Sequence, residues 1–530
     1  METIKNPILK GFNPDPSFIC VGEDYYIATS TFEWYPGVQI HHSKDLVNWE
    51  LIIRPLTRLS QINLSGDKCS GGVWAPCLSY SSGKFYLIYS DVKTSSTFYD
   101  VNNYLVTAED IMGPWTEPIF LNSSGFDPSL FHDEEGRKWL VNMKFDYRVW
   151  KIRFSGIEIQ EYFEEEQCLI GEPQVIFTGT TNRITEGPHI YKRNNYYYLF
   201  CAEGGTVYKH AEVVLRSNNL KGPYELSPYN PLITSLPYPQ NPLQKAGHAS
   251  MAQGKDGRWY LAHLCGRPVG KGRYCILGRE TALQEVIWDN DWPRLIGRTS
   301  EPQSELEVSV CCENKTEECV EWSDDFDNEI WNINFQTLRV PLLDRASLKI
   351  RPGYLRLYGK ESLESLFEQS LLACRQQHLY AQVDTKLDFS PVSYQQTAGL
   401  VYYYDSMSHY YVYITWDEEQ GRVISMMNKV LDNFSQPMGV GIKIPVSGEV
   451  YLRLVILEDN AQFYYSMDGI NYFKVYEPLD ATVLSDDYYE YHIGQGRYTG
   501  AFIGICCQDI SGRRNHADFD FYRYKNLDVR

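Results

Sequence analysis

Three carboxylates stand at or beside the same place in a short phrase that recurs along the first half of the chain. Asp15 and Asp127 each begin an Asp-Pro-Ser phrase, and Glu186 directly precedes the matching Gly-Pro-His. Hydrolysis of a glycosidic bond needs one carboxyl group that is protonated near neutral pH and a second that is ionised. A third carboxylate beside the acid keeps its pKa up, because two adjacent negative charges resist forming. The three residues are therefore candidates for these three roles.

The phrase occurs five times, and its second residue falls at positions 16, 76, 128, 188 and 249. The steps are 60, 52, 60 and 61 residues, which indicates a repeat architecture. In each copy a short apolar strand leads through a turn into a strand rich in aromatic and β-branched residues, as in a β-hairpin. A step of about 60 residues holds four strands, so the sequence predicts a five-bladed β-propeller whose equivalent strand starts meet at one mouth.

The local sequence around each carboxylate bears on its role. Asp15 lies between two prolines, which restrict the backbone and hold the carboxylate in place. Asp-Pro is also ordinary turn chemistry, but its repetition at Asp127 argues against that interpretation for both residues. Glu186 sits one position ahead of the frame, where a longer side chain could reach the same axis. Glu203 and the acidic run at 164–166 are predicted to be loop or surface groups.

The second half of the chain has a different pattern. After a stretch at 299–321 that lacks a sustained period, short alternating strands are expected at 354–358, 399–403, 410–415, 451–456 and 461–465. No helical period of useful length appears. The prediction is an all-β chain with a propeller at 1–300, a connecting segment at 301–321 and a β-sandwich of the jelly-roll or lectin-like kind at 322–530. The sandwich is expected to help close the active site; a free carbohydrate-binding module is the alternative.

Composition excludes several classes of partner. The formal charge of −19 argues against nucleic acid, which needs a basic field. No apolar stretch of about 18 residues exists that could span a membrane. The 13 cysteines include no CxxC pair, so a zinc site is not expected, and we expect the cysteines to be reduced. The N-terminus lacks the apolar core of a signal peptide, which predicts a cytoplasmic location.

Eight stretches in order along the propeller region form a specific set. They are 11–17 (GFNPDPS), 30–34 (STFEW), 36–40 (PGVQI), 42–49 (HSKDLVNW), 72–76 (GVWAP), 126–129 (FDPS), 185–189 (TEGPH) and 277–281 (LGRET). In these stretches the chain resembles glycoside hydrolases of family 43, of the β-xylosidase branch that couples a five-bladed propeller to a C-terminal β-sandwich. The region of the predicted sandwich is similar to that family's second domain.

The resemblance implies an inverting mechanism. Asp15 would be the general base, Glu186 the general acid, and Asp127 the carboxylate that orients the acid and raises its pKa. It implies no required cofactor. In the fifth repeat His248 occupies the position that Asp15 and Asp127 occupy in theirs. Some relatives bind calcium or a water cluster there, so calcium at His248 stays open.

The resemblance also implies a set of substrate-binding residues. Phe32 and Trp74 would be aromatic walls of the pocket for the terminal sugar, and Arg279 would clamp sugar hydroxyls. Where relatives commonly have Trp-Asp, this chain has Phe145-Asp146, which would alter the pocket rim. Phe502 is the best match for a phenylalanine that the second domain inserts into the active site. Tyr498 is close in sequence and is the alternative.

The implied function is an exo-acting glycosidase of xylan degradation that releases xylose from the non-reducing ends of β-1,4-xylo-oligosaccharides. Side activity on α-L-arabinofuranosides is expected, because the two pentoses present similar hydroxyl arrangements. A predominant α-L-arabinofuranosidase is the nearest alternative, and a non-catalytic sugar-binding propeller is the alternative from another class. A homodimer and a homotetramer both stay open.

Overall fold

The chain forms two units in the computed structural model, which describes residues 2–95, 97–308 and 321–528. The first unit comprises Met1–Arg267 and Arg279–Lys315, and the second comprises Pro268–Gly278 and Thr316–Arg530. The sequence prediction assigned one continuous stretch to each domain, so it did not place Pro268–Gly278 in the second unit. Within the described part of the chain, no helix has the length and apolar character needed to cross a bilayer.

The first unit contains five antiparallel sheets, each built from strands that follow one another along the chain. The first blade is β2 (Ser17–Val21), β3 (Asp24–Thr29), β5 (Gln39–Ser43) and β6 (Glu50–Ile53); the second is β7 (Gly72–Ser81), β8 (Lys84–Ser95), β9 (Tyr99–Ala108) and β10 (Ile119–Asn122). The third is β11 (Ser129–His132), β12 (Lys138–Phe145), β13 (Phe154–Phe163) and β14 (Cys168–Phe177). The fourth is β15 (Thr185–Arg193), β16 (Tyr196–Glu203), β17 (Ala211–Ser217) and β18 (Glu225–Leu226), with β19 (Ile233–Thr234) also paired to β17; the fifth is β20 (Gln244–Gln253), β21 (Trp259–Gly266), β22 (Glu280–Asp289) and β23 (Trp292–Leu295).

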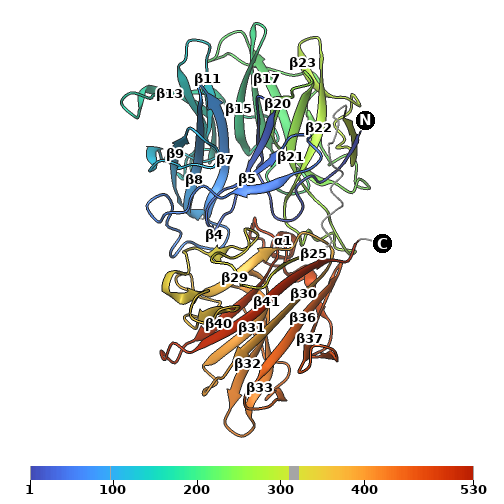
Figure 1. The fold of residues 1–530 in the computed structure, drawn as a ribbon. Coiled ribbons are helices and arrows are strands. Elements are labelled where there is room, and N and C mark those ends of the chain that lie inside the picture. Colours follow the sequence, from blue (N-terminus) through green and yellow to red (C-terminus); the bar gives the residue numbers. More distant parts are fainter. Residues whose placement is uncertain (1, 96, 309–320, 529–530) are drawn as a thin grey trace. The chain divides into compact units, whose positions relative to one another are not determined.

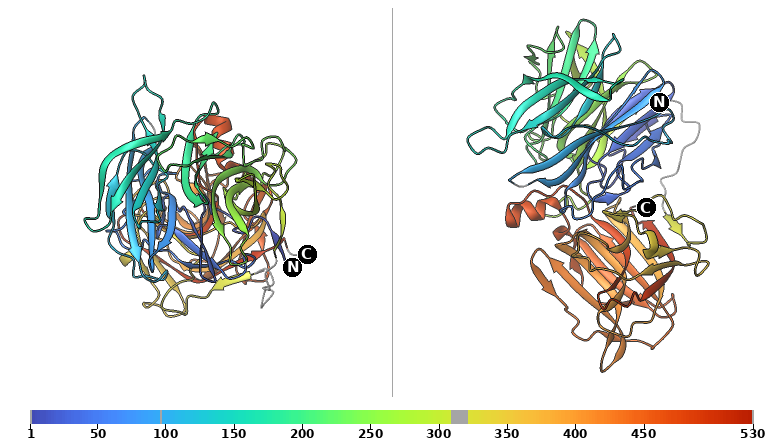
Figure 2. Two further views of the ribbon diagram at one scale, coloured as in Figure 1. Left: turned by 90° about the horizontal axis from the view of Figure 1, so that it is seen from above. Right: turned by 90° about the vertical axis from the view of Figure 1, so that its left-hand side faces the viewer.

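The five sheets close into a ring. The first strands of the blades contact one another in the order β2, β7, β11, β15, β20 and back to β2, and Figure 2 shows the sheets following one another around the unit in chain order. The predicted five-bladed propeller is therefore confirmed.

Serine hydroxyls of the repeated phrase link neighbouring blades. Ser17 Oγ accepts the amide of Leu78 (2.9 Å), Ser129 Oγ donates to Pro188 O (2.5 Å), and Ser250 Oγ donates to Pro16 O (2.7 Å). The serine thus has a structural role that is separate from that of the carboxylate in the same phrase.

Three short strands of this unit lie outside the five sheets. β1 (Glu2–Lys5) pairs antiparallel with β24 (Glu305–Val308), and β4 (Trp34–Tyr35) lies between β3 and β5 in the chain. The sequence had treated 301–321 as a connecting segment only, yet part of it forms β24 because its apolar residues Leu306 and Val308 are buried. The rest of that segment, 309–320, lies outside the described residues.

The second unit is built from two antiparallel sheets (Figure 1). One sheet has the order β27 (Ala346–Ser347), β28 (Leu355–Tyr358), β41 (His516–Asn526), β30 (Tyr380–Phe389), β36 (Glu449–Leu457), β37 (Asn460–Ser466) and β38 (Phe473–Lys474), with β25 (Glu321–Asp324) paired to β41 and β39 (Leu479–Asp480) to β37. The other has the order β29 (Ser370–Arg375), β40 (Phe502–Asp509), β31 (Gln396–Asp405), β32 (Ser408–Asp417), β33 (Gly421–Val430) and β34 (Asn433–Ser435), with β35 (Ile442–Lys443) paired to β33. The remaining elements are β26 (Thr337–Leu338), η1 (Leu343–Arg345), η2 (Ala481–Val483) and α1 (Asp486–Ile493).

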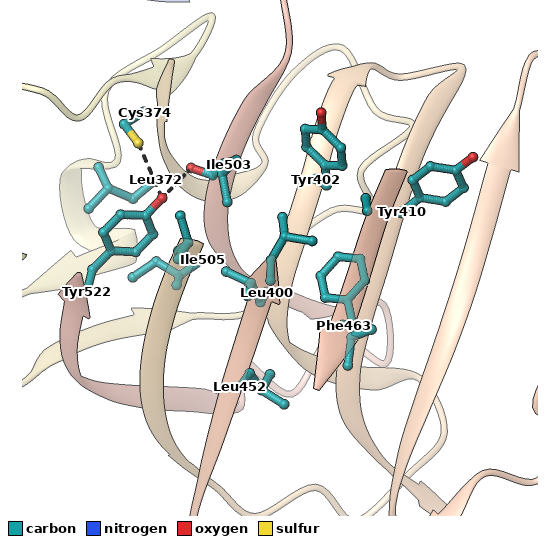
Figure 3. Packing of buried hydrophobic residues seen from close by; sticks show 14 of the residues in the cluster. Leu372, Cys374, Leu400, Tyr402, Tyr410, Leu452, Phe463, Ile503, Ile505 and Tyr522 are labelled. Atoms are coloured by element: carbon teal, nitrogen blue, oxygen red, sulfur yellow. Dashed lines mark hydrogen bonds between the residues drawn. The ribbon is translucent and has the colours of Figure 1, made fainter. Parts of the chain in front are cut away.

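Alternation of apolar and polar residues explains this core. Along β36 every second residue is buried, which places Leu452, Leu454 and Ile456 on the inner face. Figure 3 shows how such side chains pack, with the Tyr522 hydroxyl bonded to Ile503 O (3.0 Å) and Cys374 Sγ (3.2 Å). The predicted β-sandwich is therefore confirmed. The sequence analysis had found no useful helix here, and α1 is an eight-residue helix whose N-terminus Ser485 caps.

Candidate active site

The first residue of each repeated phrase, here called the lead position, has a left-handed backbone. The φ angles are 57° at Asp15, 35° at Ala75, 53° at Asp127, 57° at Gly187 and 47° at His248. Residues other than glycine rarely adopt such angles, and they persist where the surrounding structure holds them in place. The repeat therefore imposes the same unusual backbone on all five blades, with or without a carboxylate.

Asp15 is held by three neighbours at the start of the first blade. Arg279 Nη1 donates to Asp15 Oδ1 (2.6 Å), Ser30 Oγ donates to Oδ2 (2.6 Å), and His248 Nδ1 lies 3.7 Å from Oδ1. Burial alone would raise the pKa of Asp15, but Arg279, His248 and Ser30 hold that pKa below its ordinary value. Asp15 is therefore ionised at neutral pH, as a general base must be.

Asp127 and Glu186 form the other part of the site. Asp127 Oδ2 accepts the backbone amide of Gly187 (3.0 Å), which directly follows Glu186 in β15. Burial and the carboxylates of Glu186 and Asp15 raise the pKa of Asp127 well above its usual range, and burial and Asp15 raise the pKa of Glu186 to about 8. The two groups titrate together. The Gly187 amide favours the charged form of Asp127, so we place the shared proton on Glu186.

A steric reason explains why the glutamate precedes the lead position in the fourth blade. A Cβ added at Gly187 would stand 3.1 Å from the imidazole of His248, closer than most real contacts. A side chain at the lead position would crowd this ring, and in the fourth blade the preceding residue supplies the carboxyl group. Glu186 has no hydrogen-bond partner among the residues that the structure describes, which leaves its carboxyl group available to a ligand.

Aromatic rings line the same region. The Phe32 ring lies 5.7 Å from that of Trp74, and the Arg279 guanidinium lies 5.3 Å from the centre of the Phe32 ring. Trp74 is fixed by its indole N–H, which donates to Ser70 O (3.0 Å), and by an edge contact with Phe126 at 5.5 Å. Phe126 directly precedes Asp127. The predicted wall residues Phe32 and Trp74 therefore lie among the residues that hold the carboxylates.

Phe145 ends β12 and is half-buried. Its ring stacks on Tyr99 at 4.1 Å, and Tyr99 in turn meets the edge of Trp74 at 6.3 Å. Phe145 is thus linked to the aromatic wall through one intervening ring. Its role at the pocket rim stays a prediction.

Sequence reasoning missed two polar residues near the carboxylates. Ser30 bonds Asp15 and also accepts the amide of Ala75 (2.8 Å); it lies in the STFEW stretch, but nothing in its residue type marked it. Glu203, predicted to be a loop or surface group, is instead fully buried at the end of β16. It accepts bonds from Thr180 and Thr185, next to Glu186, and these donors explain why a buried carboxylate is tolerated.

The residues around His248 supply few protein ligands for calcium. Calcium takes six to eight oxygen ligands, whereas the His248 imidazole faces the Gly187 backbone and shares Asp15 with the guanidinium of Arg279. Over the described ranges, no group of three or more His, Cys, Asp or Glu residues is arranged to hold a metal ion. The sequence left calcium at His248 open, and it stays a prediction.

Phe502 belongs to the second unit, where it begins β40 and is fully buried. Its backbone pairs with Arg375 and Tyr403, and the Arg375 guanidinium lies 5.2 Å from the centre of its ring. Entry of Phe502 into the active site stays a prediction. Tyr498, the alternative, lies four residues earlier in a segment without regular structure.

Comparisons with known proteins agree with this chemistry. The model of "Glycosyl hydrolases family 43" matches residues 4–293, and that of the "Beta xylosidase C-terminal Concanavalin A-like domain" matches 323–525. A "Beta-xylosidase" of Bacillus subtilis is 50% identical, covering 98% of this chain and 99% of its own, and a "Xylosidase/arabinosidase 43B" of Humicola insolens is 46% identical, covering 99% and 98%. The crystal structure of a xylan β-1,4-xylosidase from Bacillus halodurans has a TM-score of 0.95 and 49% identity, covering 99% of this chain and 100% of that one.

Proposed function

Because the chain belongs to glycosyl hydrolase family 43 and is a glycoside hydrolase, we propose that it is an inverting exo-β-xylosidase. Its substrates are short β-1,4-xylo-oligosaccharides, from whose non-reducing ends it releases D-xylose. One observation carries this proposal. Two buried carboxyl groups of one site have opposite pKa shifts, with that of Asp15 lowered and that of Glu186 raised to about 8.

The pKa shifts assign the roles in hydrolysis. Asp15 takes a proton from a water molecule, whose oxygen forms a bond to the anomeric carbon on the face opposite the leaving group. The bond between that carbon and the glycosidic oxygen breaks, its electron pair goes to the oxygen, and Glu186 donates its proton there. Between the low pKa of Asp15 and a pKa of about 8 for Glu186, both groups are in the required state.

The other residues orient the acid and the sugar. The Asp127 carboxylate, ionised against the Gly187 amide, opposes ionisation of Glu186 and fixes the backbone beside it. Phe32 and Trp74 offer apolar faces to the C–H groups of a terminal xylose. Arg279 donates one N–H to Asp15, and the family resemblance gives its guanidinium the further role of binding sugar hydroxyls.

Anomeric analysis tests the mechanism. An inverting enzyme must release α-xylose first from a β-xyloside, and proton NMR of the early product would detect it. Initial release of β-xylose would refute the assignment of Asp15 as a base that activates water.

A predominant α-L-arabinofuranosidase is the second candidate, favoured by the relative named "Xylosidase/arabinosidase 43B". Steady-state kinetics on an aryl β-D-xyloside and an aryl α-L-arabinofuranoside, measured side by side, decide between the two. A larger kcat/KM on the arabinofuranoside would reverse the assignment. Sugar binding without turnover of either substrate would favour a non-catalytic propeller.

Two further properties complete the proposal. A cytoplasmic location rests on the residue pattern of the sequence, and cell fractionation tests it. Assembly into a homodimer or a homotetramer rests on the family resemblance, and light scattering on the purified chain separates these two states from a monomer.

A further inference from the structure

A β-bulge puts His248 beside the catalytic carboxylates. In β20, Gly247 pairs with Leu264 and Ala249 pairs with His263, which leaves His248 as an extra residue without a partner on β21. Two residues of this stretch, Lys245 and His248, have left-handed φ angles of 58° and 47°. Such angles cost free energy unless neighbouring groups hold them.

Two side chains of the fourth blade hold this bulge. His210 directly precedes β17 and Glu212 is the second residue of that strand, which contacts β20 (Figure 1). His210 Nδ1 donates to Lys245 O (3.0 Å), and a Cβ at Gly247 would stand 2.8 Å from the His210 ring. Glu212 Oε2 accepts the amide of Ala249 (2.9 Å) on the other side of His248.

Burial of the Glu212 carboxyl group costs free energy that a purely structural position does not require. Its side chain is fully buried, and Oε1 has no hydrogen-bond partner among the residues that the structure describes. Burial and the Glu203 carboxylate raise the pKa of Glu212 well above its usual range, although the amides of Ala249 and His248 oppose this. An apolar residue of similar volume would avoid that cost, so a buried carboxyl group here calls for an explanation.

We propose that His210 and Glu212 are positioning residues that keep the bulge of β20 in place and thereby hold the imidazole of His248 between Asp15 and Gly187. The imidazole lies 3.7 Å from Asp15 and fills the space in front of Gly187, whose amide bonds Asp127. Loss of the bulge would move His248 away from both neighbours. Asp15 would then lose a contact, and so would the backbone next to Glu186. The inference rests on the proposed function, which makes Asp15 the base and Glu186 the acid.

The test compares two substitutions of Glu212 in the full chain. Glu212→Met keeps the volume and removes the acceptor, and Glu212→Gln keeps an acceptor oxygen for the Ala249 amide. On an aryl β-D-xyloside we expect Glu212→Met to lower kcat at least tenfold with KM within twofold, because the change affects the reacting groups more than the sugar pocket. Glu212→Gln should stay within threefold of the wild type in both constants.

Glu285→Met is the matched control. Glu285 is also a buried carboxylate, but it lies in the fifth blade, pairs with Arg258 at the far end of that sheet and does not touch the bulge. The Glu285→Met variant should have a lower melting temperature without a tenfold loss of kcat. Equal losses of kcat in Glu212→Met and Glu285→Met would reduce the effect to general destabilisation and overturn the proposal, as would a Glu212→Gln variant as impaired as Glu212→Met.

A second readout does not depend on activity. The imidazole Cε1–H resonance of His248, assigned by its loss in His248→Gln, should shift in Glu212→Met and stay in place in Glu212→Gln. An unshifted resonance in Glu212→Met overturns the proposal. A shifted resonance in a chain that hydrolyses neither pentoside would support the bulge-holding role and refute the proposed function instead.

Discussion

Removing the guanidinium of Arg279 should leave the Asp15 carboxylate without its counter-ion in the interior of the first unit. Arg279 Nη1 and Asp15 Oδ1 are 2.6 Å apart, and the two side chains are only 3% and 5% exposed. Removal of one partner of such a buried pair typically costs about 3–5 kcal/mol, because it leaves an uncompensated charge. At roughly 2 °C per kcal/mol for a domain of this size, Arg279→Met should lower the melting temperature by about 6–10 °C at neutral pH.

The drop in melting temperature caused by Arg279→Met should be larger at neutral pH than at acidic pH. In the wild type the lowered pKa of Asp15 contributes stability above the unfolded-state value of 3.8, and this stability is lost as pH falls through the folded-state pKa. Without Arg279, burial dominates and raises the pKa of Asp15, so the variant can take up a proton where the wild type cannot. The gap in melting temperature should therefore be largest at pH 7.5 and smaller at pH 5, and the acidic limb of kcat/KM should move to higher pH.

Scanning calorimetry on a double-mutant cycle is the assay. Arg279→Met combined with Asp15→Asn should recover most of the stability that Arg279→Met loses, since no charge is then buried alone. Arg258→Met serves as the control, because its ion pair with Glu285 is more exposed and lies away from Asp15. A double variant no more stable than Arg279→Met, or a gap that does not change with pH, would refute the reasoning.

Three further predictions concern other residues. Asp127→Asn should move the alkaline limb of kcat/KM to lower pH, because the charges of Asp127 and Glu186 repel each other and loss of one lowers the pKa of the other; an unchanged limb in a pH–rate profile would make Asp127 structural. Gly500→Ala should destabilise the second unit by about 1–3 kcal/mol in calorimetry, because its Cβ would stand 2.5 Å from Leu277 O; an unshifted transition would contradict the close packing. Phe502→Leu, which keeps a buried apolar side chain, should raise KM for xylose-terminated substrates in steady-state assays, and an unchanged KM would remove Phe502 from the pocket.

Local patterns in the sequence were enough to predict the architecture. The spacing of the phrase and the alternation within each strand predicted five blades, because hairpin chemistry and the two-residue period are properties of neighbouring residues. The same holds for the second unit, where each of the five expected strands lies almost entirely within an observed one. The candidate carboxylates were also found locally, since their residue type and their place in the repeat were both visible.

The sequence did not reveal why Glu186 precedes the lead position or why Asp15 is ionised. The first depends on the His248 ring, which would crowd a side chain at Gly187. The second depends on Arg279, which is 264 positions from Asp15 in the chain. Glu203 was misassigned for a related reason, because donors from the preceding loop and from β15 make its burial possible.

The sequence by itself determined which residues could do acid–base chemistry and how many blades carry them, because both follow from residue type and from short periods. Only the tertiary structure decided the protonation states of those residues and the assignment of Pro268–Gly278 to the second unit. A pKa depends on burial and on charges within a few ångströms, and packing depends on which surfaces meet. Both are set by contacts between residues that are far apart along the chain, which no local pattern records.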